Sequence, residues 1–157
     1  MASVRIAAAH DAANCAEIVI GLPDFFTDDV PDKVQRDLRD HGGWVIEDAD
    51  DVVGFVIVER RGTRAAEILW AAIAADRRGR GLGRRLIDHA LAELGADGVQ
   101  IVEVKTLDPS ADYAPYDATR AFWIARGFVQ FDTIDPLPGW PPGNPAALLA
   151  AALAPTR

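Results

Sequence analysis

Five arginines and three glycines lie within the nine residues 77–85, Arg-Arg-Gly-Arg-Gly-Leu-Gly-Arg-Arg. An apolar, strand-like run precedes this segment, and apolar residues at helical spacing follow it. The first turn of a helix leaves backbone N–H groups without partners and carries partial positive charge. Glycines let a phosphate approach the main chain, and arginines add cationic forks. The segment therefore predicts a binding site for an anion, most simply a pyrophosphate.

The rest of the chain is strongly acidic. The protein has 16 lysines and arginines against 24 aspartates and glutamates, a formal net charge of −8. Outside residues 77–85 there are 11 basic and 24 acidic residues, a balance of −13. A single basic segment on an acidic chain favours one phosphate-bearing ligand and disfavours nucleic acid. The acidic remainder favours a cationic substrate.

Two common phosphate motifs do not fit these glycines. A Walker A loop requires a lysine after its last glycine, and here arginines follow. A dinucleotide fingerprint requires Gly-x-Gly-x-x-Gly, whereas Gly79, Gly81 and Gly83 alternate. Glu103 does lie about twenty residues downstream, where a ribose-binding acid is sought. That fold needs repeated strand–helix units, however, and this chain ends in strand–loop–strand, so the sequence argues against a nicotinamide or flavin site.

The third pattern is Arg-x-x-Gly-x-Gly, which residues 78–83 satisfy. In its setting, it resembles the acyl-CoA loop of the GNAT superfamily of N-acetyltransferases. Residues 73–77 resemble the family's strand end before that loop. Residues 121–128, Ala-Phe-Trp-Ile-Ala-Arg-Gly-Phe, resemble its second marker, an aromatic residue four positions before Gly-Phe. The motifs match over residues 65–128, and the earlier part of the chain matches only in the order of its elements.

The resemblance implies an α/β domain with the acyl-CoA N-acyltransferase (GNAT) fold, a mixed, splayed central sheet of about seven strands flanked by about four helices. A length of 157 residues suits one domain, taken as residues 1–157. Apolar periodicity and turn residues place strands at 4–8, 44–46, 53–59, 65–75, 99–107, 128–134 and 146–153. They place helices at 11–22, 32–40, 86–94 and 116–126, with Asp11 as the N-cap of the first. Residues 146–153 would also suit a short helix.

The resemblance also assigns residues to acetyl-CoA, the expected co-substrate. The residues implied to hold its pyrophosphate are Arg78, Gly79, Arg80, Gly81, Leu82, Gly83 and Arg84. The strand ending near Ile73 would separate from the strand at 99–107, and the pantetheine arm would pair with the backbone at Ala71 and Ile73. A backbone N–H there would polarise the thioester carbonyl. The acceptor amine would attack directly, so the reaction requires neither an enzyme nucleophile nor a metal.

Trp123 departs from the family's pattern, because a tyrosine often stands at this position and protonates the departing thiolate. An indole N–H donates a hydrogen bond but is not a useful proton source at neutral pH. Trp123 either packs along the pantetheine arm or lies in the core. Tyr116 is therefore a candidate catalytic residue, with Tyr113 as the other nearby phenol. A Tyr116 that merely packs against the sheet is an equal alternative.

Glu67 is the candidate general base, because it lies on the strand that leads to the acyl site and an ammonium must lose a proton before it attacks. The alternative for Glu67 is an exposed strand residue paired with an arginine. Glu103 is a second candidate. Further acidic residues are expected around the acceptor mouth, where they either attract a cation or merely keep the protein soluble: Asp24, Asp28, Asp29, Asp108 and Asp112.

These features predict an N-acetyltransferase that moves an acetyl group from acetyl-CoA to a primary amine in a ternary complex. The alternative is a catalytically inactive acyl-CoA-binding regulatory module, which the missing tyrosine favours. The acceptor is expected to be a small-molecule or peptide amine, most simply a cationic one. A single cysteine (Cys15), no signal peptide and no apolar run of roughly 18 residues predict a cytoplasmic protein without a membrane partner. A homodimer is left open.

Overall fold

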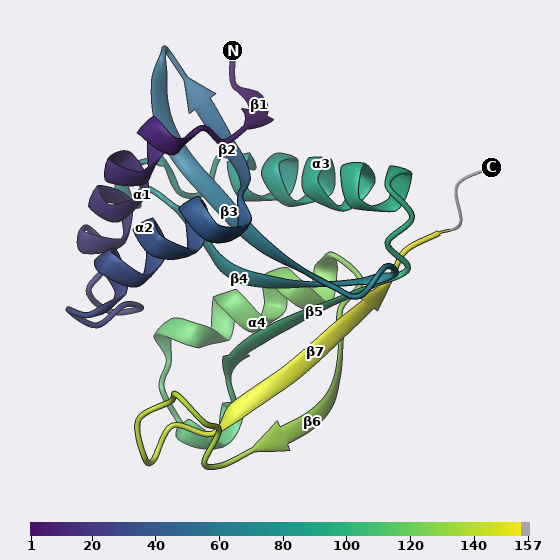
Figure 1. Ribbon diagram of the computed structural model, residues 1–157. Helices are drawn as coiled ribbons and strands as arrows, with labels where there is room; N and C mark the ends of the chain where they lie inside the picture. Colours follow the sequence, from purple (N-terminus) through teal and green to yellow (C-terminus); the bar gives the residue numbers. More distant parts are fainter. Residues whose placement is uncertain (155–157) are drawn as a thin grey trace.

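The protein is built on a seven-stranded sheet in the order β1-β2-β3-β4-β5-β7-β6, in a computed structural model that describes residues 1–154 (Figure 1). The strands are β1 (Ser3–Ile6), β2 (Gly43–Asp48), β3 (Asp51–Arg61), β4 (Ala65–Ile73), β5 (Ile101–Leu107), β6 (Val129–Ile134) and β7 (Ala146–Ala152). β4 and β5 run parallel, and the other neighbouring strands are antiparallel. The expected mixed sheet is confirmed.

β4 and β5 stay together for only part of their length. Their registered pairs run from Ala65↔Ile101 to Ile68↔Val104, although β4 continues to Ile73. Figure 1 shows the two strands diverging beyond these pairs, toward the side where α1 and α2 lie. The second half of each strand therefore borders a gap in the sheet, as expected for a splayed sheet.

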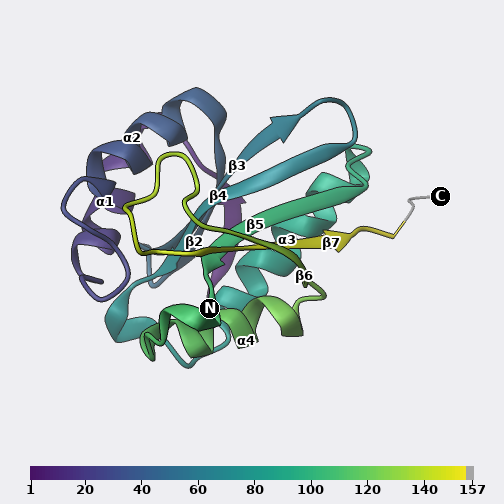
Figure 2. The ribbon, with the colours of Figure 1, turned by 90° about the horizontal axis from the view of Figure 1, so that it is seen from below.

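Two helices pack on each face of the sheet (Figures 1 and 2). α1 (Ala12–Ile20) and α2 (Val30–His41) lie on one face, and α3 (Leu82–Ala96) and α4 (Pro115–Ala125) lie on the other. Helical spacing of apolar residues gives α3 one buried stripe, made of Leu86, Ile87, Ala90 and Leu94. The α1–α2 core is formed in the same way by the residues Cys15, Val19, Val34 and Leu38, which pack with Phe55 of β3.

Cys15 is fully buried in the α1–α2 core. Burial raises the pKa of its thiol to about 12, and the negative charge of Asp11 acts in the same direction. A thiol with this pKa is protonated at neutral pH and is a poor nucleophile. Cys15 therefore has the properties of a packing residue.

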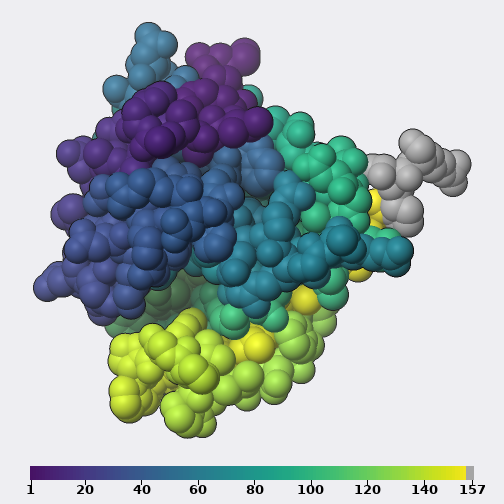
Figure 3. All heavy atoms as spheres, viewed as in Figure 1, coloured from purple at the N-terminus to yellow at the C-terminus, as the bar shows by residue number. Residues whose placement is uncertain are grey.

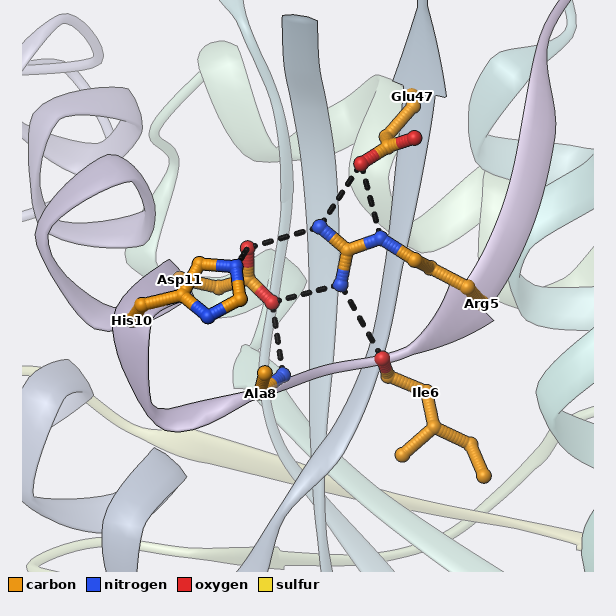
Figure 4. Close-up of polar contacts among 6 residues, drawn as sticks. All are labelled: Arg5, Ile6, Ala8, His10, Asp11 and Glu47. Atoms are coloured by element: carbon orange, nitrogen blue, oxygen red, sulfur yellow. Dashed lines mark hydrogen bonds and ion pairs between the residues drawn. The ribbon is translucent and has the colours of Figure 1, made fainter. Parts of the chain in front are cut away.

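An ion pair between the partly exposed Arg5 and the buried carboxylate of Asp11 fixes the N-terminal strand (Figure 4). Asp11 is 1% exposed, and its carboxylate accepts hydrogen bonds from Arg5 Nη1 and Nη2 at 2.8 and 2.9 Å. The N–H of Ala8 donates to the same carboxylate at 2.7 Å, and Arg5 also donates to Glu47 of β2 at 2.8 Å. Asp11 does occupy the N-cap position of α1, as expected, but its carboxylate turns back to Arg5 and Ala8 and makes no cap hydrogen bond to α1.

The other predicted elements are present, and they differ mainly at their ends. α3 begins at Leu82, inside the glycine-rich segment 77–85, rather than at residue 86. Residues 75–77 form a 3₁₀ turn instead of the end of a strand. Residues 146–152 form a strand and not a helix, because β5 and β6 pair with β7 on both sides. Within residues 1–154, no helix is long and apolar enough to cross a membrane.

Candidate functional site

A cleft of about 1410 Å³ opens where β4 and β5 separate. The diverging halves of the two strands border it, and so does the glycine turn that precedes α3. The remaining walls are the α1–α2 loop (residues 21–29), the start of α4 and the β6–β7 loop (residues 135–145). Figure 3 shows the atoms of the β6–β7 loop, in yellow-green, below the blue atoms of the α2 region. The cleft is thus assembled from segments that are far apart in the sequence.

The glycine turn offers open space and hydrogen-bond donors. Gly79 and Gly81 have φ angles of 77° and 74°, a left-handed conformation that other residues rarely adopt. A Cβ atom added at either glycine would meet nothing within 4 Å. The N–H of Arg85 donates to the carbonyl of Gly81 at 3.1 Å. The N–H groups of residues 82–84 precede this bond and therefore have no acceptor in the previous helical turn.

The arginines of this segment take different positions. Arg77 donates to Asp48 of β2 at 3.2 Å, so its guanidinium is held by the sheet. The guanidinium carbon of Arg78 lies 4.8 Å from the ring centre of Phe25, in the α1–α2 loop. The other three arginines of the segment are exposed: Arg80, Arg84 and Arg85. Arg78 therefore joins the glycine turn to the opposite wall of the cleft.

The free edge of β4 presents backbone groups to the cleft. In an antiparallel pair, hydrogen-bonded and non-bonded residues alternate along the strand. The N–H of Ala74 donates to the carbonyl of Val53 on β3 at 2.8 Å, which fixes the phase of this alternation. The backbone groups of Ala72 consequently point to β3. Those of Ala71 and Ile73 point away from β3, into the gap between β4 and β5.

A bulge in β4 changes which face its side chains occupy. The register with β3 skips Leu69, which lies between the paired residues Ile68 and Trp70. Ile68 packs in the core beneath α3 and α4, called here the α3–α4 core, which includes Leu86, Trp123 and Ala147. Because of the extra residue, Ala71 packs against the same core. Leu69 and Trp70 both pack with the α1–α2 core instead. The bulge thus turns the Trp70 ring toward the α1–α2 side of the cleft.

Glu67 lies one residue before β4 and β5 separate, and it is 5% exposed. Its carboxylate accepts hydrogen bonds from Arg61 and from Lys105 Nζ, the latter at 2.9 Å. Lys105 Nζ also lies 3.1 Å from the carboxylate of Glu103. Burial alone would lower the pKa of Lys105, but the two carboxylates together raise it. The alternative of an arginine partner for Glu67 is therefore present, although the expected exposure is not.

Two tyrosines fasten the start of α4 to the α1–α2 loop. Tyr116 Oη donates to the carbonyl of Phe25 at 2.8 Å, and the two rings meet edge-on with centres 5.3 Å apart. Tyr113 Oη donates to the carbonyl of Asp24 at 2.8 Å. Burial raises the pKa of Tyr116 to about 12, and Tyr113 adds to the shift. A phenol with this pKa gives up its proton less readily than an ordinary tyrosine.

Trp123 lies in the core and also borders the cleft, whereas the sequence left open whether it packs in the core or along the pantetheine arm. It is 5% exposed, and its ring packs edge-on against Phe122 and Phe128 with centres 5.1 and 5.2 Å apart. It also borders the cleft. Thr106 of β5 borders the same cleft and is 4% exposed. Among residues 1–154, its hydroxyl is the one buried side-chain polar atom without a hydrogen-bond partner.

The acidic residues expected at the acceptor mouth are divided by the structure. Asp24 and Asp29 border the cleft, together with Asp37 and Glu67, which were not in that group. Trp70 Nε1 donates to Asp37 at 2.7 Å. The remaining acids of the group do not border the cleft: Asp28, Asp108 and Asp112.

Asp108 instead ties the end of β5 to β6. Its carboxylate accepts hydrogen bonds from Ser110 Oγ at 2.6 Å, Gln130 Nε2 at 2.8 Å and Thr133 Oγ1 at 2.9 Å. Burial opposes the charge on Asp108, but these hydrogen bonds outweigh burial and lower its pKa to about 2. The Asp108 carboxylate therefore has a structural role, and its position in a polar loop of the sequence did not indicate these partners.

A sequence model of the acetyltransferase (GNAT) family matches residues 10–124, which include the glycine turn and most of α4. The chain belongs to the GNAT acetyltransferase family. No curated protein matches it in sequence.

Solved structures with this GNAT fold cover nearly the whole chain. A GNAT-family protein from Desulfovibrio desulfuricans superposes with a TM-score of 0.85 at 19% identity, over 98% of this chain and 100% of that one. The ribosomal-protein-S18-alanine N-acetyltransferase from Escherichia coli gives 0.78 at 18% identity, over 100% and 97%. An aminoglycoside 6'-N-acetyltransferase complexed with coenzyme A gives 0.75 at 15% identity, over 99% of each chain. The mixed sheet and its four helices are thus the GNAT fold.

Sequence reasoning missed several residues that border the cleft of this GNAT protein: Arg61, Lys105, Thr106, Trp70 and Asp37. Strand alternation puts Glu103 and Lys105 on one face of β5, but the contact of Lys105 with Glu67 depends on the parallel register of β4 and β5. No sequence signal indicated that Thr106 would be unpartnered. Within the described part of the chain, no group of three His, Cys, Asp or Glu side chains is placed to hold a metal ion.

Proposed function

We propose that this GNAT protein transfers an acetyl group from acetyl-CoA to a primary amine by direct attack in a ternary complex. The supporting observation is the glycine turn at the start of α3 beside the free edge of β4. The turn offers three N–H groups and open space for a pyrophosphate, with Arg78, Arg80 and Arg84 around it. The β4 edge offers the backbone of Ala71 and Ile73 to the amides of a pantetheine arm. The cleft therefore offers partners to both parts of an acyl-CoA, the pyrophosphate and the pantetheine arm.

In the proposed reaction the amine nitrogen attacks the thioester carbonyl carbon. The new C–N bond forms, the C–S bond breaks, and the sulfur keeps the bonding electron pair. A backbone N–H on the free edge of β4 stabilises the oxyanion. Glu67, which borders the cleft, takes the proton that the ammonium loses, directly or through water. For Tyr116 the hydrogen bond to Phe25 supports a role in positioning the α1–α2 loop, and its role as an acid stays a prediction.

The walls of the cleft favour an acceptor with one ammonium group on an aromatic or apolar body. The aromatic side chains along these walls are Phe25, Phe26, Trp70, Tyr113, Tyr116, Phe122, Trp123 and Trp140. Most carboxylates there already have partners, because Lys33 pairs with Asp29 at 2.7 Å, Trp70 with Asp37 and Lys105 with Glu67. Among residues 1–154, Asp24 is the one bordering carboxylate without a side-chain partner. Of the cationic acceptors expected, those with a single positive charge therefore fit this cleft best.

Release of free CoA with a panel of primary amines tests the reaction, and calorimetry with acetyl-CoA tests the cofactor site. We expect turnover by the wild type and loss of acetyl-CoA binding in Gly81→Val, because a β-branched residue disfavours the left-handed conformation. Binding of acetyl-CoA without turnover of any amine would favour the acyl-CoA-binding regulatory module. A wild type that does not bind acetyl-CoA would contradict both functions.

The acceptor class is tested by comparing phenylethylamine with spermidine and an aminoglycoside at low and high salt. We expect kcat/KM to be roughly tenfold higher for the aromatic monoamine and to change little with salt, because few free charges attract it. Phe26→Leu should raise KM for the aromatic amine. Phe131→Leu, which removes an exposed ring on β6, is the matched control. A salt-sensitive preference for the polycations would contradict this acceptor class.

A further inference from the structure

Thr106 lies on β5 two residues beyond Val104, the last β5 residue paired with β4. Its partner on β7 is Ala147, which belongs to the α3–α4 core. Residues paired across antiparallel strands point to the same face of a sheet. The side chain of Thr106 therefore points to the α4 side, the side on which Trp123 packs, and both residues border the cleft.

The hydroxyl of Thr106 is buried without a partner. The residue is 4% exposed, and within residues 1–154 no other buried side-chain nitrogen or oxygen is left without a hydrogen bond. An unpaired buried hydroxyl costs stability, whereas a valine of the same shape does not. A hydroxyl that borders a ligand cleft and has no protein partner indicates a partner on the ligand.

We propose that the Thr106 hydroxyl donates a hydrogen bond to the sulfur of CoA as the thioester C–S bond breaks. This inference rests on the proposed function, and it fills a gap in it, because an indole replaces the usual phenol at Trp123 and Tyr116 donates to a carbonyl. Thr106 supplies a hydrogen bond and not a proton. The thiolate keeps the electron pair of the broken bond and takes its proton from solvent. This proton balances the second proton that the nitrogen loses to solvent as the amide forms, the first having gone to Glu67.

Two substitutions of Thr106 test its contribution to the rate. In Thr106→Val, kcat should fall roughly 10- to 100-fold, the cost of one hydrogen bond to a developing charge. KM for acetyl-CoA should stay near the wild-type value, because the bond forms fully only when the sulfur becomes charged. Thr106→Ser should recover most of the rate. The matched control is Thr63→Val, at the exposed turn between β3 and β4.

Two further measurements separate catalysis from structure and from the proposed function. Chemical unfolding of Thr106→Val should show stability equal to or above wild type. Ultraviolet titration of bound CoA should show a thiol pKa about one unit higher in Thr106→Val, because the thiolate has lost a donor. This shift is expected even if no amine is acetylated. The titration therefore tests the contact between Thr106 and the CoA sulfur independently of the proposed acetyl transfer. Wild-type kcat or an unchanged thiol pKa in Thr106→Val would overturn the proposal.

Discussion

At the scale of single residues, the carboxylate of Glu67 is held by two cations from two neighbouring strands. Arg61 comes from β3 and Lys105 from β5, and both contacts depend on the register around the point where β4 and β5 separate. The arrangement gives the carboxylate a fixed orientation at the edge of the cleft. A proton acceptor placed in this way needs little reorganisation when an amine arrives.

The role of Glu67 as a base predicts the behaviour of Glu67→Gln. Its kcat should fall roughly 10²-fold, because the amide cannot accept the proton of the ammonium. The profile of kcat against pH should also change shape, and steady-state assays across the pH range will measure this profile. Glu59→Gln, which alters another carboxylate bonded to Arg61, is the matched control. An unchanged kcat and pH profile would move the role to Glu103 or to solvent.

Arg78 is expected to bind the pyrophosphate from the side of the glycine turn. Arg78→Ala should weaken acetyl-CoA binding by about 1.5–3 kcal/mol, the range for a hydrogen bond to a charged group. Calorimetry measures this loss, with Arg64→Ala at an exposed turn as the control. Equal affinity in the wild type and Arg78→Ala would show that the backbone of the turn holds the phosphates alone.

At the scale of elements, the N-terminal strand depends on one buried carboxylate. Arg5→Ala removes the charged donor of the buried Asp11 carboxylate, so the free energy of unfolding should fall by about 2 kcal/mol. Arg60→Ala breaks an ion pair with Asp97 in which both side chains are exposed, and it should cost less than about 1 kcal/mol. Urea unfolding of both variants gives the comparison. Equal losses would mean that the contacts around Asp11 are not energetically special.

The link between β5 and β6 predicts a dependence of stability on pH. The folded pKa of Asp108 is about 2, below its ordinary value of 3.8, so its stabilisation is complete above about pH 5 and is lost as pH falls toward 2. Asp108→Asn should lower the free energy of unfolding by about 1–2 kcal/mol at pH 7 and by much less near pH 2. Asp112→Asn is the control, because asparagine accepts its left-handed backbone. A loss independent of pH would contradict the role of the charge.

The elements themselves follow from local pattern, and their contacts do not. Apolar residues at helical spacing predict α3, and the Ala-rich β7 was predicted as a strand although its composition also suits a helix. The capping pattern predicts the N-cap position of Asp11, but it does not predict the partners of the carboxylate. Only the pairing of β1 with β2 brings Arg5 to it.

At the scale of the whole molecule, the order of elements and the contiguous glycine turn were sufficient to predict the GNAT fold. The acyl-CoA site that the same segment indicates stays a prediction. The acceptor side was not predictable in the same way, because the cleft collects residues from the α1–α2 loop, β4, β5, α4 and the β6–β7 loop. Tyr116 and Phe25, for example, meet across 91 positions of sequence. The acidic composition predicts a cationic acceptor, and only the ion pairs of the folded chain show how few carboxylates at the cleft remain free.

The separation of β4 from β5 also has a consequence for amide hydrogen exchange. The N–H groups of Trp70 and Ala72 bond to β3, whereas those of Ala71 and Ile73 face the cleft, so slow and fast exchange should alternate along a single strand. Addition of CoA should slow exchange at Ala71 and Ile73 and leave their two neighbours unchanged. Uniform exchange along these four residues, with or without CoA, would contradict the assigned strand edge. Within residues 70–73, the exchange rates of Ala71 and Ile73 therefore report whether a ligand fills the space beside β4, and those of Trp70 and Ala72 serve as the reference.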